Sequence, residues 1–215
     1  MIPSLARLVR GLSALFWGLP LALLLSARTA LADWWIGSGW IPIMAAHGVI
    51  LFGLWQLRFF QPTERVWLSA LDRTALFAWS NLALAPSAWW WSHRPDETFF
   101  QQGFILLSFS GIGFLLSLNH ALKRLVAMIP DEVLRTEARF FAGINSRLLL
   151  GLLFVLSGFL LVRWVPNLPK SLWWITLIFG RVEGWHFLMP IILPVALTMT
   201  ILWKAKEYVL TSLFR

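Results

Sequence analysis

The chain has 215 residues, of which 59% are hydrophobic and only 13% are charged, and its mean hydropathy is +0.72. Soluble domains carry charge on about a quarter of their residues, so the polar residues here are too few to cover a water-facing globule. The composition also excludes a disordered chain, a collagen and a coiled coil, and it predicts an integral membrane protein. The chain has no cysteine, which excludes disulfides, thiolate metal sites and cysteine nucleophiles because each of these needs sulfur.

Net charge sets the expected partners. In a soluble protein a formal charge of +8 would suggest a nucleic acid. In a membrane protein, however, the position of each lysine and arginine matters more than their sum. We therefore interpret the excess as topology and lipid contact, and we expect the lipid bilayer, and no nucleic acid, as a partner.

Six stretches without charged residues are candidate membrane spans, because about 20 helical residues cross the hydrocarbon layer. They cover residues 11–27, 34–57, 74–92, 98–122, 148–162 and 184–203. The expected fold is an all-α integral membrane protein, one transmembrane domain over residues 1–215. Basic inner ends and tryptophan-rich outer ends recur in a way that suggests three tandem hairpins, although any six-span protein would share this pattern. A further apolar piece, 171–180, is expected to be interfacial or re-entrant.

Most lysines and arginines fall on one side of these six spans if the N-terminus is cytoplasmic. The positive-inside rule then places both termini in the cytoplasm, and we expect a cell membrane, specifically a bacterial inner membrane. A secretory signal is the rival interpretation. Arg7 and Arg10 make a basic start, 12–25 an apolar core and 30–32 a cleavage site before Asp33. Cleavage there would leave five spans and an outer N-terminus.

The longest inner segment, 123–147, is expected to contain an amphipathic helix over about 130–145. Pro130 followed by two acidic residues is a typical helix start. The apolar residues of this segment then fall on one side of a helix, which predicts a helix lying on the inner leaflet. Glu137 interrupts the apolar stripe and should pair with an arginine or face a partner. The segment either connects two spans or forms a docking surface, whose partner-binding residues would be Phe140, Phe141 and Glu137.

Tryptophan is unusually frequent, with 15 residues. Indole prefers the headgroup zone, so an interfacial belt is the simplest explanation. The alternative is an aromatic box for a small cationic or aromatic solute, because acidic residues lie on the same side. Trp89, Trp90 and Trp91 are consecutive and cannot all point one way on a helix, so at least one of them should face protein. The expected outer aromatic cluster is Trp34, Trp35, Trp89, Trp90, Trp91, Trp173 and Trp174.

His47 lies at the centre of the second span and is the most deeply placed ionisable group. Such a residue suggests a proton relay, a ligand contact or an axial metal ligand; the alternative is a neutral imidazole bonded to a carbonyl group. Asn119 and His120 are expected near the inner interface. The four histidines are too far apart for a local metal site, and we expect no metal, cofactor or catalytic residue. The expected solute path is His47, Asn81, Pro190 and Pro194.

Two packing expectations follow from the remaining intramembrane residues. Glycine and serine residues of the fourth span should meet those of the fifth, because small side chains let helices approach closely. Asp72 and Arg73, at the inner start of the third span, should pair with each other.

Motifs for nucleotide binding, zinc proteolysis and acyl transfer are absent from the sequence. The favoured hypothesis is a non-catalytic transport or channel protein for a small solute, since an intramembrane histidine and paired prolines are costly features for a passive scaffold. The alternative is a structural or assembly subunit that binds other membrane subunits or further copies of itself. A third is a membrane-embedded lipid or cofactor enzyme.

Overall fold

The computed structural model describes residues 2–31, 39–164 and 188–213, and within them it contains six helices and no strand. The expected all-helical fold is confirmed for this part of the chain. The expected piece 171–180 and the residues Trp34, Trp35, Trp173 and Trp174 lie outside the described residues. The helices are α1 (Ile2–Leu31), α2 (Trp40–Arg58), α3 (Arg65–His93), α4 (Thr98–Ala127), α5 (Glu132–Trp164) and α7 (Leu188–Leu213).

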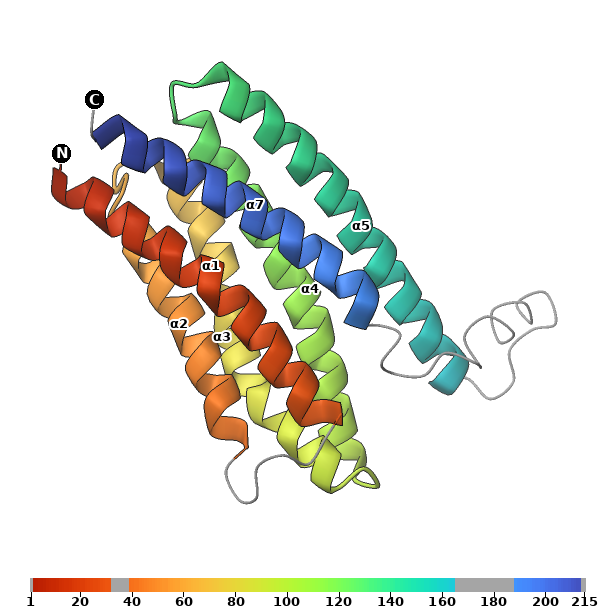
Figure 1. The fold of residues 1–215 in the computed structure, drawn as a ribbon. Coiled ribbons are helices and arrows are strands. Elements are labelled where there is room, and N and C mark those ends of the chain that lie inside the picture. The colour runs from red at the N-terminus through yellow and green to blue at the C-terminus, as the bar shows by residue number, and fades with distance from the viewer. Residues whose placement is uncertain (1, 32–38, 165–187, 214–215) are drawn as a thin grey trace.

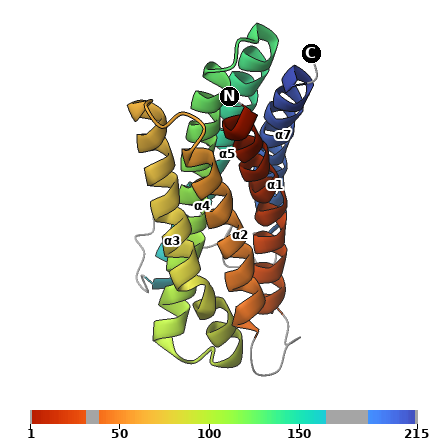
Figure 2. The same cartoon turned by 90° about the vertical axis from the view of Figure 1, so that its left-hand side faces the viewer.

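The six helices form a closed ring in which α1, α2, α3, α4, α5 and α7 each pack against the next, and α7 packs against α1. Both termini lie at one end of the bundle, together with the α2–α3 and α4–α5 turns, whereas the α3–α4 turn lies at the opposite end (Figures 1 and 2). Neighbouring helices are therefore antiparallel throughout the ring. We call the end that carries the termini the terminal end.

One apolar core runs through the bundle and takes side chains from every described helix. Fully buried members, one from each helix in chain order, are Leu12, Leu57, Trp67, Leu118, Leu149 and Leu202. Among the described residues, α1, α2, α4 and α5 are long and apolar enough to cross a membrane. Each of these four helices also exposes large apolar side chains, among them Trp17, Phe52, Leu106 and Phe154. Extensive exposed apolar surface marks contact with a membrane or another protein, which agrees with the membrane protein that the composition predicts.

α3 begins at Arg65, well before residue 74, where the sequence predicted the third span to start. The Glu64 side chain accepts a hydrogen bond from the Trp67 backbone N–H (3.3 Å) and so caps the helix. The charged side chains of the first turns point outward, which the helix tolerates. Asp72 pairs with Arg58 of α2 at 3.0 Å, so the expected pair with Arg73 is replaced by an ion pair between two helices.

Glycine residues set the closest helix contacts. A Cβ atom added to Gly11 would lie 2.9 Å from the carbonyl oxygen of Gly53, and one added to Gly53 would lie 3.0 Å from that of Gly11. Only glycine on both sides allows α1 and α2 this approach. In α4, a Cβ atom on Gly103 would lie 2.8 Å from Ser87 of α3, whereas Gly151 of α5 has nothing within 4 Å. These α4 and α5 glycines therefore do not meet each other, contrary to the sequence prediction.

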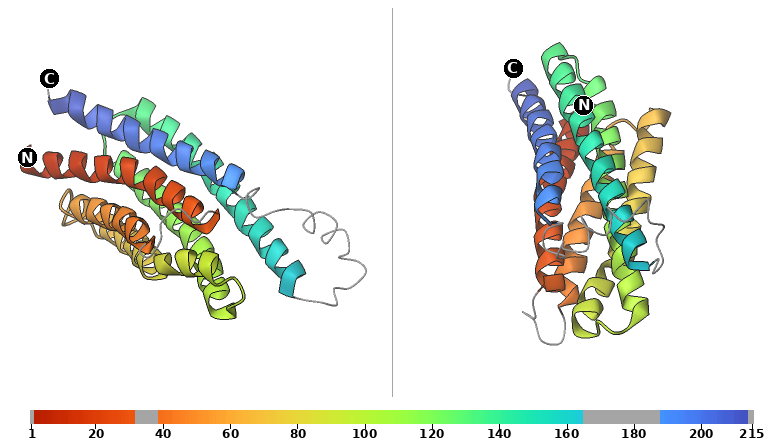
Figure 3. Two further views of the ribbon diagram at one scale, coloured as in Figure 1. Left: turned by 60° about the horizontal axis from the view of Figure 1, so that its bottom comes forward. Right: turned by 90° about the vertical axis from the view of Figure 1, so that its right-hand side faces the viewer.

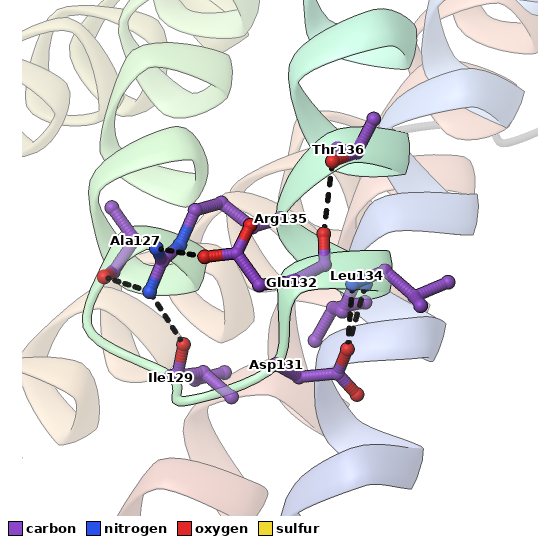
Figure 4. A network of polar contacts seen from close by, with 8 residues as sticks. Ala127, Ile129, Asp131, Glu132, Leu134, Arg135 and Thr136 are labelled. Atoms are coloured by element: carbon purple, nitrogen blue, oxygen red, sulfur yellow. Dashed lines mark hydrogen bonds and ion pairs between the residues drawn. The ribbon is translucent and has the colours of Figure 1, made fainter.

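The turn between α4 and α5 is held by a local polar network (Figure 4). Asp131 Oδ1 accepts hydrogen bonds from the backbone N–H groups of Val133 (2.9 Å) and Leu134 (3.0 Å). Arg135 donates to Glu132 Oε1 (3.1 Å) and to the carbonyl oxygens of two residues at the end of α4. Both helix ends thus find partners for their free backbone groups, and the helix start that the sequence predicted after Pro130 is confirmed.

α5 runs without a break from Glu132 to Trp164. The expected amphipathic helix over 130–145 and the expected fifth span over 148–162 are therefore parts of one element. The charged residues of the first turns lie outside its buried stripe, and they interrupt the apolar run in the sequence but not the helix. Its buried stripe towards the bundle consists of Leu134, Ala138, Ala142, Asn145, Leu149 and Leu152.

Candidate functional site

A buried polar cluster joins three helices near the middle of the bundle. Asn119 of α4, Asn145 of α5 and Thr198 of α7 have no exposed surface. Asn145 Nδ2 donates to Thr198 Oγ1 (2.9 Å) and to the Pro194 carbonyl oxygen (3.0 Å). Asn119 Nδ2 donates to Thr198 Oγ1 (3.2 Å) and to the Leu115 carbonyl oxygen (2.7 Å). The Thr198 hydroxyl in turn donates to the Pro194 carbonyl oxygen (2.8 Å). We call Asn119, Asn145 and Thr198 the amide cluster.

The amide cluster contains two unsatisfied hydrogen-bond acceptors. The side-chain oxygens of Asn119 and Asn145 are buried and have no hydrogen-bond partner among the described residues. A buried acceptor without a partner costs about 1–3 kcal/mol. The cluster contains no titratable side chain, so it is suited to holding a donor or a cation and unsuited to acid–base or nucleophilic chemistry.

The helix periodicity explains why these side chains meet. Asn145 occupies a position of the buried stripe of α5, one turn from Ala142 and Leu149. Thr198 follows Pro194 by one turn, so its hydroxyl reaches back to that carbonyl group, as threonine commonly does in helices. The amide cluster therefore forms where the stripes of α4, α5 and α7 face a common point.

The sequence assigned no role to two members of this cluster, Asn145 and Thr198. Asn119 was expected near the inner interface, and the structure shows that its side chain is fully buried between helices. The available signal was an asparagine in phase with alanine and leucine residues along one helix face, a position where a polar side chain needs a partner on another helix. Of the expected solute path, Pro194 contacts the cluster, since its carbonyl oxygen accepts hydrogen bonds from Asn145 and Thr198.

His47 is buried, with 7% of its surface exposed. Its Nδ1 lies 2.9 Å from the Ile43 carbonyl oxygen, which can only accept, so Nδ1 carries the proton and donates. The imidazole is thus bonded one turn back along its own helix. This arrangement is the structural alternative that the sequence left open for this residue.

The other two residues of the expected path lie apart from the cluster. Asn81 of α3 is buried, and its side-chain oxygen has no hydrogen-bond partner in the described part of the chain. Pro190 of α7 is exposed. Of the four residues of the expected path, only Pro194 therefore lies beside the amide cluster.

The middle tryptophans of the expected outer cluster form an aromatic layer between α3 and α4. Trp91 stacks on Phe104 with ring centroids 4.5 Å apart, and Trp90 stacks on Phe100 with centroids 5.5 Å apart. Trp89 makes an edge-on contact with Trp90 at 4.7 Å. The expectation that at least one of the three faces protein is confirmed.

The residues expected to bind a partner have different surroundings. Glu137 forms an ion pair with Lys204 of α7, whose ammonium also lies 5.5 Å from the ring centre of Phe141. Phe141 packs against the core, while Phe140 is 64% exposed. Within the chain, Glu137 and Phe141 thus join α5 to α7, and the exposed Phe140 ring makes an edge-on contact with Phe141 (5.9 Å).

Among the described residues, no group of three histidine or acidic side chains could hold a metal ion. No family model matches the chain, and comparisons with curated proteins and with solved structures also find no match.

Proposed function

We propose that the protein is a multi-pass protein of a cell membrane, a bacterial inner membrane, with six spans and both termini in the cytoplasm. Four apolar helices of sufficient length support a membrane location. α3 and α7 would be the other two spans, because they pack side by side with these helices in the same ring. The basic residues near the terminal end support its cytoplasmic orientation.

The absence of native cysteine allows a clean test of this topology. A membrane-impermeant maleimide applied to intact cells should label Glu97→Cys, in the α3–α4 turn, and should label Thr136→Cys, in the first turns of α5, only after lysis. Both positions are exposed. The opposite labelling pattern would invert the proposed orientation.

We further propose that the protein transports a small cationic solute and that the amide cluster binds it within the membrane. The observation that carries this proposal is the pair of fully buried carboxamide oxygens without partners on Asn119 and Asn145. An acceptor oxygen in an apolar bundle gains most from an N–H donor or a cation.

The surroundings of the carboxamides favour a cation. The atoms that now accept from the two amide nitrogens are all oxygens, namely Thr198 Oγ1 and the carbonyl oxygens of Leu115 and Pro194. If a carboxamide turned by 180°, its own oxygen would replace its nitrogen and would face these acceptor oxygens. Its orientation depends on the groups that it contacts, so a bound cation would favour the turned form. An oxygen-only environment is typical of sodium-like cations, and main-chain carbonyl groups near helix breaks serve this purpose in transporters.

Uptake of radiolabelled sodium and methylammonium by proteoliposomes tests the transport proposal. The wild-type protein should take up one of them faster than protein-free liposomes. Asn145→Leu removes the acceptor and should reduce uptake at least about tenfold, the effect of losing about 1.4 kcal/mol of binding. Asn145→Asp keeps an acceptor oxygen and should retain uptake. The matched control Ser157→Ala, far along α5, should match wild type.

Two results would contradict the transport proposal. One is wild-type uptake equal to that of empty liposomes for both probes. The other is full uptake by Asn145→Leu, which would remove the cluster from the path.

A second function, that of a membrane complex subunit, is supported by the far half of α5. Leu150, Phe154 and Leu161 are exposed there, and Gly151 faces open space. An apolar hollow of about 390 Å³ lies between this half and α4. Small residues on an exposed apolar face allow another helix, from another membrane subunit or a second copy, to approach closely.

Native mass spectrometry in mild detergent tests the subunit function. The wild-type protein should be recovered with a second chain, and Gly151→Leu should release it by blocking close approach. Leu76→Ala is the control, because it shortens an exposed side chain of α3, outside the far half of α5. Recovery of wild-type protein only as a monomer, with bound lipid retained, would contradict this function.

A further inference from the structure

A polar pocket opens between the start of α3 and the end of α4, at the terminal end of the bundle. Its volume is about 350 Å³, within the range of small-molecule sites. Three arginines line it, together with a histidine and a serine: Arg65, Ser69 and Arg73 from α3, and His120 and Arg124 from α4. The pocket is separate from the amide cluster and from the far half of α5.

The positive charge of this pocket is not neutralised within the described residues. No ion pair is formed there by Arg65, Arg73 or Arg124. Lys123 acts electrostatically on His120 together with Arg73 and Arg124, so it adds a further cation beside the pocket.

The acidic residues that adjoin Arg65 and Arg73 in the sequence have other partners. Glu64 caps α3 through the Trp67 backbone N–H. Asp72 is paired with Arg58. The pocket therefore gathers cations from two helices without an acidic residue to pair them, an arrangement that like-charge repulsion disfavours unless an anion is bound.

We infer that this pocket binds a phosphate group, that of an anionic phospholipid of the inner leaflet or of a soluble phosphate compound. Arginine presents a planar fork of N–H donors that matches phosphate oxygens. Ser69 and His120 add neutral donors of the kind that fix the orientation of a bound anion. Basic pockets between helices on the cytoplasmic side are suited to lipid headgroups, and the lateral opening between α3 and α4 lies beside the membrane in the proposed topology.

The test uses the full-length protein and measures which lipids remain bound. The protein is reconstituted in an equal mixture of phosphatidylglycerol and phosphatidylcholine, and retained lipid is counted by native mass spectrometry. Wild type should retain phosphatidylglycerol in preference. A basic residue near an anionic lipid contributes about 1 kcal/mol, so Arg73→Gln with Arg124→Gln should weaken binding about 25-fold.

A matched double variant separates this pocket from general basicity. Arg139→Gln with Arg147→Gln removes the same charge from exposed positions of α5 outside the pocket, and it should leave binding within about twofold of wild type on the same scale. All four arginines are exposed, so the variants should keep the wild-type elution volume and unfolding temperature.

Inorganic phosphate at millimolar concentration distinguishes the two sources. Retention of phosphatidylglycerol that phosphate does not displace assigns the site to lipid. A rise in unfolding temperature with phosphate, lost in the pocket variant and without lipid preference, assigns it to a soluble phosphate compound. The inference is overturned if wild type shows neither effect, or if the pocket variant binds as wild type does.

Discussion

The two halves of α5 differ sharply in how they are held. The first half is capped by Asp131, paired through Glu137 with Lys204, and bonded through Asn145 to α7. In the second half, the Ser157 hydroxyl donates to the Leu153 carbonyl oxygen of the same helix, and Phe154 is 74% exposed. The comparison teaches that polar contacts anchor this helix near the terminal end, while beyond them it relies on apolar surroundings.

The arrangement of the ribbons agrees with this difference. α5 starts beside α4 at their shared turn and diverges from it towards its own far end (Figures 1 and 3). Only 17% of the most apolar stretch of α5 is buried within the chain, compared with 44% for α4. α5 is therefore less buried within the chain than α1, α2 or α4, which leaves more of its surface for lipid or for another helix.

The largest expected effect comes from two adjacent leucines where the halves meet. Leu149 is fully buried and Leu150 is 54% exposed. Leu149→Ala removes packed atoms and should lower the free energy of unfolding by about 2–5 kcal/mol, whereas Leu150→Ala should change it by less than about 0.5 kcal/mol. Thermal unfolding in mild detergent, followed by tryptophan fluorescence, measures both. Equal losses would show that the chain packs the two positions alike.

The amide cluster should give the next largest effect. Asn145→Ala and Thr198→Val should each cost about 1 kcal/mol of stability, and together less than their sum, because polar contacts between helices in membranes couple by about 0.6–1.7 kcal/mol. Ser146→Ala is the control, since that hydroxyl bonds only to the Ala142 carbonyl oxygen of its own helix. Strict additivity in the double variant would mean that the cluster does not tie α5 to α7.

The ion pair between Glu137 and Lys204 should contribute less. Both side chains are partly exposed, and such pairs typically contribute about 0.2–1 kcal/mol. Glu137→Gln should lose this amount, and exchange of the charges in Glu137→Lys with Lys204→Glu should recover most of it. The same unfolding assay at low and high salt measures the pair, and a charge exchange as unstable as the single variant would rule out its contribution.

The smallest effect is expected in the far half of α5. Ser157 is exposed and bonds only to the Leu153 carbonyl oxygen one turn back. Ser157→Ala should change the free energy of unfolding by less than about 0.5 kcal/mol. A loss as large as that of Asn145→Ala would show that this half is packed more tightly than its exposure indicates.

The sequence predicted the helices better than their ends. Runs without charge located the apolar middle of each described helix, because charge is costly inside the hydrocarbon layer. The ends were missed because α3 and α5 continue through charged turns around Asp72 and Glu137, whose side chains reach solvent or a partner helix. Helix formation depends on the backbone, so it does not stop where hydropathy falls.

The candidate site was harder to predict, for a physical reason. The position of His47 at the centre of a predicted span indicated a buried side chain, and the structure buries it. The pattern of one helix could indicate that Asn145 needs a polar partner, but it could not identify Asn119 and Thr198 as those partners, because their meeting depends on how three helices are rotated against one another. The pocket between α3 and α4 was likewise hidden, because Arg65 and Arg124 are far apart in the sequence.

The unbroken length of α5 has a consequence for the shape of the protein in a bilayer. At about 1.5 Å per residue, its 33 residues measure about 50 Å, whereas the hydrocarbon layer is about 30 Å thick. A straight helix of this length is longer than the hydrocarbon layer by roughly a dozen residues. The polar contacts of α5 with α7 include the ion pair of Glu137 with Lys204 in its first turns, so under the proposed topology the surplus would project from the cytoplasmic face as a short extension supported by α7.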